Sequence, residues 1–122
     1  MIWHEYLDAA DIHLFDCSGK VDLATGLARL TAVARVFETQ PARAGLRRLL
    51  IDFRGTEWDS EETHRTLSSA TRAQFDRMRE SARLRVAIVN ALWEGCHSTD
   101  ERWFLEKQAA LRWLSAEDGH AA

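Results

Sequence analysis

Residues 49–53 read Leu-Leu-Ile-Asp-Phe, and this short apolar run decides the fold. It follows two arginines and stops before Gly55, so its length is that of a strand and not of a helix. A strand covered on both faces has an almost unbroken apolar run, because neither face meets water. The run therefore predicts a central strand in a sheet that carries helices on its faces.

Other strands surround this one in the predicted sheet. The run 86–89, Val-Ala-Ile-Val, has the same buried character. At the N-terminus, residues 2–7 and 12–17 alternate moderately around the polar turn at 8–11, which predicts a hairpin. Ser18-Gly19-Lys20 is expected to end the second strand of that hairpin.

Three segments have the period of amphipathic helices. The first begins at Asp22 and ends before Pro41 and Gly45, the second spans residues 59–81, and the third spans residues 99–115. The side chains expected to face the sheet are Leu23, Leu27, Leu30, Ala34 and Phe37 in the first helix, Leu67, Thr71, Phe75, Met78 and Ala82 in the second, and Phe104, Leu111 and Leu114 in the third.

Capping boxes mark two of the helix starts. Asp59-x-x-Glu62 and Ser98-x-x-Glu101 have the required spacing, so Asp59 and Ser98 are predicted to satisfy free backbone amides at those starts. The resulting order is β-β-α-β-α-β-α. We therefore expect an α/β fold with a four-stranded mixed sheet and helices packed on it. Residues 1–118 are expected to form one domain, with a frayed tail at 119–122.

Composition excludes several classes of protein. The chain has 122 residues, with 16 Lys and Arg against 19 Asp and Glu, and this slight acidity argues against nucleic-acid binding. No apolar run reaches the length of a membrane span, and the first residues lack the pattern of a signal peptide. Cys17 and Cys96 lie far apart with no metal-type spacing, which is typical of free thiols in a reducing compartment. A cytoplasmic location is expected.

The stretch 49–60, Leu-Leu-Ile-Asp-Phe-Arg-Gly-Thr-Glu-Trp-Asp-Ser, carries a family resemblance. It resembles the core signature of STAS domains, the superfamily of anti-sigma factor antagonists and sulfate-transporter tails. In those domains a strand ending in Asp-Leu leads through a short loop to Asp-Ser-x-Gly at a helix start. Ser18-Gly19, the run 86–89 and the stretch 110–114, Ala-Leu-Arg-Trp-Leu, extend the likeness to the SpoIIAA-like branch. This resemblance implies a non-enzymatic regulatory module that binds a protein partner.

Ser60 is the position that the resemblance singles out, because a partner kinase phosphorylates the matching serine of the antagonists. Here Glu61 and Glu62 replace the small residue and the glycine that normally follow. Two carboxylates beside the serine would repel a phosphate. The favoured interpretation is that Asp59 and Ser60 cap the helix, and phosphorylation of Ser60 is the alternative.

A binding edge is expected where the carboxyl ends of the parallel strands converge. The loops that meet there are 18–20, 54–60 and 91–98. Trp58 and Trp93 would either form a contact surface or fold back as lids over helix ends. The candidate ligand- or partner-binding residues are Lys20, Arg54, Trp58, Asp59, Trp93, Cys96 and His97.

Catalytic and metal-binding interpretations are weaker. Ser60 and His64 lie one helical turn apart, as in a hydrolase pair, but no Gly-x-Ser-x-Gly elbow accompanies them. If Asp8 faces Asp11 in the hairpin, His4 lies diagonal to His13 on one face. Their spacing matches no zinc motif, so hydrogen-bonded filler histidines are favoured. No nucleotide-binding motif is present, and no cofactor or metal is expected.

Two functions from different classes follow. The leading hypothesis is an interaction module that binds a protein partner or a second copy, as a homodimer whose contact includes Trp93 or Trp103. Trp113 is expected in the core. The alternative is a carrier of a small apolar ligand, because SpoIIAA-like domains are grouped by similarity with lipid-binding CRAL-TRIO proteins. A carrier of an ordinary ligand would need a pocket of roughly 300 Å³ or more.

Overall fold

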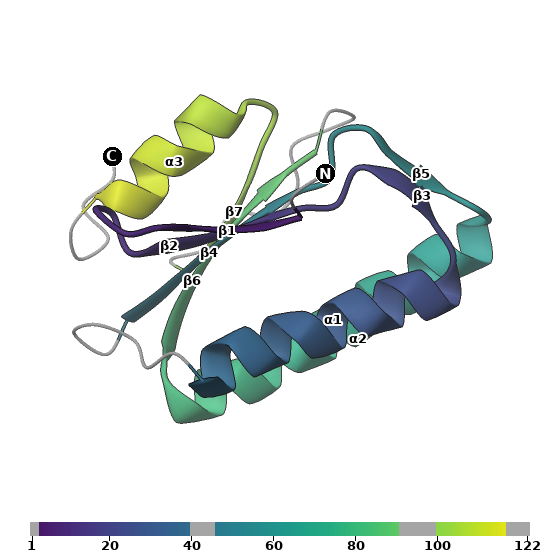
Figure 1. Cartoon of the computed structure of the whole chain (residues 1–122), viewed down its shortest axis with the longest axis horizontal. Helices are drawn as coiled ribbons and strands as arrows, with labels where there is room; N and C mark the ends of the chain where they lie inside the picture. Colours follow the sequence, from purple (N-terminus) through teal and green to yellow (C-terminus); the bar gives the residue numbers. More distant parts are fainter. Residues whose placement is uncertain (1–2, 40–45, 91–99, 117–122) are drawn as a thin grey trace.

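A computed structural model describes residues 3–39, 46–90 and 100–116 of the chain. These residues form a mixed α/β fold with three helices, a five-stranded sheet and a separate two-stranded sheet. Helices α1 (Leu23–Thr39) and α2 (Glu61–Ser81) lie on one face of the larger sheet, and α3 (Lys107–Ser115) lies on the other (Figure 1).

The larger sheet has the order β1-β2-β4-β6-β7. Its first pair is antiparallel and the other pairs are parallel. Leu49 and Leu50 are fully buried in the middle strand, which confirms that the run 49–53 belongs to a central strand. The strands are β1 (His4–Leu7), β2 (Ile12–Asp16), β4 (Leu46–Asp52), β6 (Arg83–Val89) and β7 (Glu101–Phe104).

The N-terminal hairpin has the predicted register. Tyr6 pairs with His13 and Leu7 with Ile12, so the ladder runs toward a turn in which Asp8 faces Asp11. Asp11 has a φ of 54°, a conformation that aspartate tolerates better than most residues. Its carboxylate accepts a 2.7 Å hydrogen bond from the Tyr6 hydroxyl, which ties the turn to β1.

The predicted strand count was wrong, because residues 101–104 form a strand and not the first turn of the third helix. These four residues alternate between the two faces of the sheet. Trp103 packs against the core below α1 and α2, whereas Phe104 packs against the core below α3. Glu101 therefore belongs to β7 and caps no helix, and Ser98 lies outside the described residues.

A small parallel sheet also departs from the expected loops. It pairs β3 (Gly19–Val21) with β5 (Thr56–Trp58), although both segments were predicted to be loop. Each strand has only three residues, too few to produce an alternating pattern. Gly19 and Gly55 have φ angles of 98° and 77°, which glycine adopts readily, and the Gly19 amide donates to the Gly55 carbonyl at 3.0 Å.

The buried face of α1 is rotated from the predicted one. Leu23 and Leu27 are 40% and 43% exposed, so they do not face the sheet. The buried residues are Gly26, Val33 and Phe37. A Cβ atom at Gly26 would lie 2.2 Å from Cδ1 of Leu67, so any larger residue at position 26 would require the Leu67 side chain to shift.

The N-cap of α2 is Ser60 and not Asp59. The Ser60 Oγ accepts a 3.0 Å hydrogen bond from the Thr63 amide, while Asp59 is exposed one residue before the cap. The predicted capping box of Asp59 and Glu62 was therefore wrong, whereas the expected capping role of Ser60 is confirmed. Asp59 and Ser60 are adjacent, and both are residue types that cap helices. The extended backbone of Ser60 shows that the serine is at the N-cap position.

Replacement of Ser60 by alanine should lower the free energy of unfolding by about 0.5 to 2 kcal/mol, because one amide of the first turn loses its acceptor. Urea denaturation with an unchanged slope measures this loss. Asp59→Ala is the matched control and should have a smaller effect. Equal losses in the two variants would contradict the assignment of Ser60 as the cap.

Two cores flank the larger sheet. Alternate residues of β4 face opposite sides, so Leu49 and Ile51 join the α1–α2 core and Leu50 joins the α3 core. Trp113 is 5% exposed in the α3 core, which confirms its predicted burial. The site described below lies on the α1–α2 side.

Candidate functional site

A pocket of about 140 Å³ lies between the five-stranded sheet and helices α1 and α2. In Figure 1 the helix layer and the sheet diverge toward β3 and β5, and residues of these two short strands help to enclose the pocket. Cys17, Phe53 and Asn90 line it just after the ends of β2, β4 and β6. The pocket is thus at the carboxyl ends of parallel strands, where the sequence placed a binding edge.

The pocket walls are mostly apolar and aromatic. The sheet contributes Phe15, Ile51 and Ile88 from one face of β2, β4 and β6. The two helices contribute Leu30, Val33, Leu67 and Phe75, and Trp3, Phe53, Trp58 and Trp103 are partly exposed around the pocket. Small-molecule sites typically combine such walls with a few polar groups.

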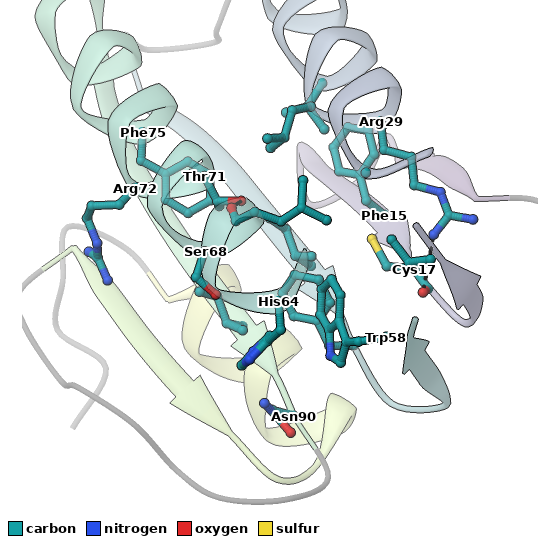
Figure 2. Close-up of a pocket in the computed structure, with 18 of the residues that line it drawn as sticks. Phe15, Cys17, Arg29, Trp58, His64, Ser68, Thr71, Arg72, Phe75 and Asn90 are labelled. Atoms are coloured by element: carbon teal, nitrogen blue, oxygen red, sulfur yellow. Dashed lines mark hydrogen bonds between the residues drawn. The ribbon is translucent and has the colours of Figure 1, made fainter. Parts of the chain in front are cut away.

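Trp58 links the small sheet to the start of α2. Its ring centroid lies 5.8 Å from that of Phe53 and 4.9 Å from that of His64 (Figure 2). Among the predicted edge residues that the structure describes, Trp58 is the one that lines the pocket. Its ring also packs on His64 in the first turn of α2, as the lid interpretation expected, and its role as a contact surface stays a prediction.

Polar side chains enter the pocket from both helices. His64, Ser68 and Arg72 lie at intervals of four residues on α2, and all three are exposed, so the pocket opens to solvent along this side. Arg29 comes from α1, and its Nη1 donates to the Cys17 carbonyl at 3.3 Å. Figure 2 shows Arg29 and Arg72 on opposite sides of the pocket.

Cys17 contributes an uncharged thiol. Burial raises the pKa of Cys17 to about 11, against a smaller opposing effect from Arg29. The thiol therefore stays protonated near neutral pH and is a poor nucleophile. Its role in the pocket wall is that of a small apolar group.

A buried carboxylate holds β7 against α2 at one side of the pocket. Glu101 is 3% exposed, and its Oε1 accepts from Nη1 of Arg72 at 2.9 Å and from Nη2 of Arg79 at 3.3 Å. Its Oε2 accepts from the Trp103 indole at 3.4 Å. These contacts fix the position of Trp103, which lines the pocket.

Three other predicted edge residues that the structure describes, Lys20, Arg54 and Asp59, do not line the pocket. Lys20 is exposed on β3, opposite Glu57 of β5. Arg54 folds back on Asp52, to which its Nε and Nη2 donate at 3.0 and 2.8 Å. Trp93, Cys96 and His97 lie outside the described residues.

Several pocket residues were missed by the sequence analysis, namely Arg29, Ser68, Arg72 and Asn90. The repeat of polar residues at 64, 68 and 72 was the available signal, because residues four apart share a helix side. The many other exposed charges of α2 obscured this repeat.

The Ser60 and His64 side chains have separate partners. The Ser60 hydroxyl is engaged by Thr63, both at the amide and at Oγ1, 3.1 Å away. The His64 ring packs against Trp58. These contacts assign Ser60 to helix capping and His64 to the pocket, and they do not form a nucleophile–base pair.

The two hairpin histidines form a pair. Nε2 of His4 lies 3.2 Å from Nδ1 of His13, and His13 is 5% exposed. Desolvation by burial lowers the pKa of both rings, and in His13 the proximity of His4 and Arg47 adds to this effect while Asp11 opposes it. Among the residues that the structure describes, no three metal-binding side chains are grouped so as to hold an ion.

Acidification should destabilise the protein through this histidine pair. Because the pKa of each ring is lowered in the folded state, the unfolded chain binds more protons once the pH falls below about 6.5. Stability is complete above that pH and decreases as the pH falls through the folded pKa values. His13→Phe should flatten this decrease in urea midpoints measured from pH 7.5 to 5. His64→Gln is the control, and equal flattening in both variants would contradict the prediction.

Comparisons with known proteins gave no match to a family model, a curated protein or a solved structure. Within the described ranges, no helix has both the length and the apolar character needed to span a membrane.

Proposed function

We propose that the protein binds a small molecule, and that the pocket beneath α1 and α2 holds the apolar part of this ligand. The observation that carries the proposal is the pocket itself, with aromatic and aliphatic walls and polar groups along its open side. Its position at the carboxyl ends of β2, β4 and β6 supports the same function, because ligands of open α/β sheets gather there.

The size of the pocket limits what it can enclose. A volume of about 140 Å³ is below the roughly 300 Å³ expected for an ordinary ligand. A cavity of about 150 Å³ is known to hold a molecule of the size of benzene. The ligand therefore has a compact apolar body, and its remaining atoms extend through the opening along α2.

Titration with 2-phenylethanol, followed by the NMR signals of the tryptophan indoles, tests the proposal. Saturable shifts are expected for Trp58 and Trp103, which line the pocket. Ser68→Phe should weaken binding because the new ring partly fills the opening, whereas Ser69→Phe, at an exposed neighbour that does not line the pocket, should not. An absence of saturable shifts both for this alcohol and for phenylacetate, which has the same ring, or equal weakening in the two variants, would rule the proposal out.

A second proposal retains the partner-binding role that the STAS-like resemblance implies. It is favoured by Leu23 and Leu27, which are one turn apart on α1 and expose large apolar side chains. Trp103, one predicted dimer contact, is partly buried against the α1–α2 core, and Trp93, the other, lies outside the described residues. Ser60 is exposed at the start of α2, where the resemblance implies a phosphorylation site.

Sedimentation at micromolar concentration tests the proposed self-association. A homodimer through α1 would sediment at twice the monomer mass of 13.9 kDa, and the Leu23→Ser/Leu27→Ser variant should return it to the monomer. Wild-type protein that sediments as a monomer would exclude the homodimer. A dimer that survives the double substitution would exclude the α1 leucines as its contact.

A further inference from the structure

We infer that the ligand is a compact carboxylic acid whose ionised carboxylate lies on the His64–Ser68–Arg72 side of α2. This inference rests on the proposed function, since it assigns chemistry to the same pocket. It goes further by naming the charge of the ligand and the residues that recognise that charge.

The charge of the pocket differs from that of the chain. The protein has more acidic than basic residues and a net charge of -3. Among the described residues that line the pocket, however, Arg29 and Arg72 are cationic and none is Asp or Glu. The Cys17 thiol adds no negative charge, since it stays protonated. Arg72 is paired with Glu101, which does not itself line the pocket, and Arg29 donates to the Cys17 carbonyl. A ligand in the pocket therefore meets guanidinium groups and no carboxylate beside the apolar wall, which favours an anion over a neutral molecule of the same shape.

The side of α2 that faces the opening provides the matching donors. His64, Ser68 and Arg72 are exposed and follow one another at intervals of one turn. Arg72 uses Nη1 for Glu101, and its side chain is 52% exposed, so other N–H groups of the guanidinium can reach a second carboxylate. The Arg72 guanidinium can meet a ligand carboxylate with charge-assisted hydrogen bonds, and the Ser68 hydroxyl one turn away offers a further donor on the same side of the helix.

Arg29 is the other cation in the pocket that could bind the ligand carboxylate, but the geometry favours Arg72. Arg29 is only partly exposed, and its guanidinium already bridges to the Cys17 carbonyl beside β2. It is accompanied in the pocket by apolar residues of α1, Leu30 and Val33. In Figure 2, His64 and Ser68 lie along the helix that carries Arg72, on the side of the pocket away from Arg29.

Phenylacetate is a suitable probe because its ring matches the pocket volume. Its carboxylate is joined to that ring through a single carbon atom. 2-Phenylethanol has the same ring and a similar length without the charge. Phenylacetate should bind at least about tenfold more tightly than the alcohol, as charge-assisted hydrogen bonds are stronger than neutral ones. The two dissociation constants are measured by the same indole NMR titration at low ionic strength.

Variants of two arginines on α2 locate the charge recognition. Arg72→Gln should remove most of the preference for phenylacetate, whereas Arg65→Gln removes the same charge from an exposed position that does not line the pocket and should leave the preference intact. Arg72→Lys should restore part of it. A urea midpoint for each variant separates a loss of affinity from a loss of fold, because Arg72 also contacts Glu101.

The outcomes distinguish the inference from the proposed function. If neither compound gives saturable shifts, the pocket is not a ligand site and both proposals fail. If both bind equally in the wild type, the small-molecule function stands and the carboxylate inference is wrong. If Arg29→Gln abolishes the preference and Arg72→Gln does not, the assignment of the carboxylate to α2 is overturned.

Discussion

Replacement of Trp113 by alanine is expected to lower the free energy of unfolding by about 3 to 5 kcal/mol. The side chain is 5% exposed in the α3 core, so its removal leaves a cavity that the rigid sheet cannot fill. The Arg85 and Arg102 guanidinium carbons lie 5.0 and 5.6 Å from the ring centroid, and both cation–π contacts are lost with it. Urea denaturation measures the loss.

Trp58→Ala is the matched control for this prediction. Trp58 is only partly buried and belongs to the pocket, so its removal should cost less stability while weakening the binding of 2-phenylethanol. Trp113→Ala, on the opposite side of the sheet, should retain binding for as long as the protein is folded. A stability loss no larger in Trp113→Ala than in Trp58→Ala would contradict the prediction.

Glu101→Ala is expected to have the second largest effect, about 3 kcal/mol, which is the lower end of the range for breaking a buried ion pair. The lower end applies because Arg72 and Arg79 retain contact with water, at 52% and 24% exposure of their side chains. The variant loses the carboxylate that joins β7 to Arg72 and Arg79 of α2. Thermal or urea unfolding measures the change.

Asp100→Ala provides the comparison for Glu101→Ala. Asp100 also accepts from Arg79, at 3.0 Å, but its side chain is 47% exposed. Exposed pairs of this kind contribute about 0 to 1 kcal/mol. If the two substitutions had equal effects, burial of the Glu101 carboxylate would not be the source of its contribution.

Local sequence patterns predicted the structure correctly where a segment has the same surroundings along its whole length. The run 49–53 is buried on both faces, and its apolar character identified the central strand. The hairpin register followed from the turn between Asp8 and Asp11, because a short turn fixes the pairing on either side.

Local patterns failed where a tertiary contact decides the structure. Glu101 has the spacing of a helix-capping residue, yet two arginines about 20 to 30 residues earlier in the chain hold it in an edge strand. Leu23 and Leu27 have helical spacing, yet α1 packs against α2 through Gly26, which contacts Leu67, and both leucines are exposed. Neither contact leaves a trace in the local sequence.

The position of the candidate site was predicted better than the residues that line it. Convergence of the strand ends predicted a site at this edge of the sheet, and Trp58 lines the pocket found there. The polar groups on α2 were missed because they come from the side of a helix, whereas the argument from strand ends considers only loops. Arg54, by contrast, was expected at the edge and is held by Asp52 two residues before it.

The close approach of α1 and α2 at Gly26 has a consequence for the volume of the pocket. Leu67 is the side chain that a Cβ at residue 26 would displace, and Leu67 also forms part of the pocket wall. A methyl group added at position 26 would therefore shift the Leu67 side chain or separate the helices, and either change would alter the shape of the pocket. Leu67→Ala would enlarge the pocket instead. The volume of the pocket can thus change through a helix-packing position without any change at His64, Ser68 or Arg72.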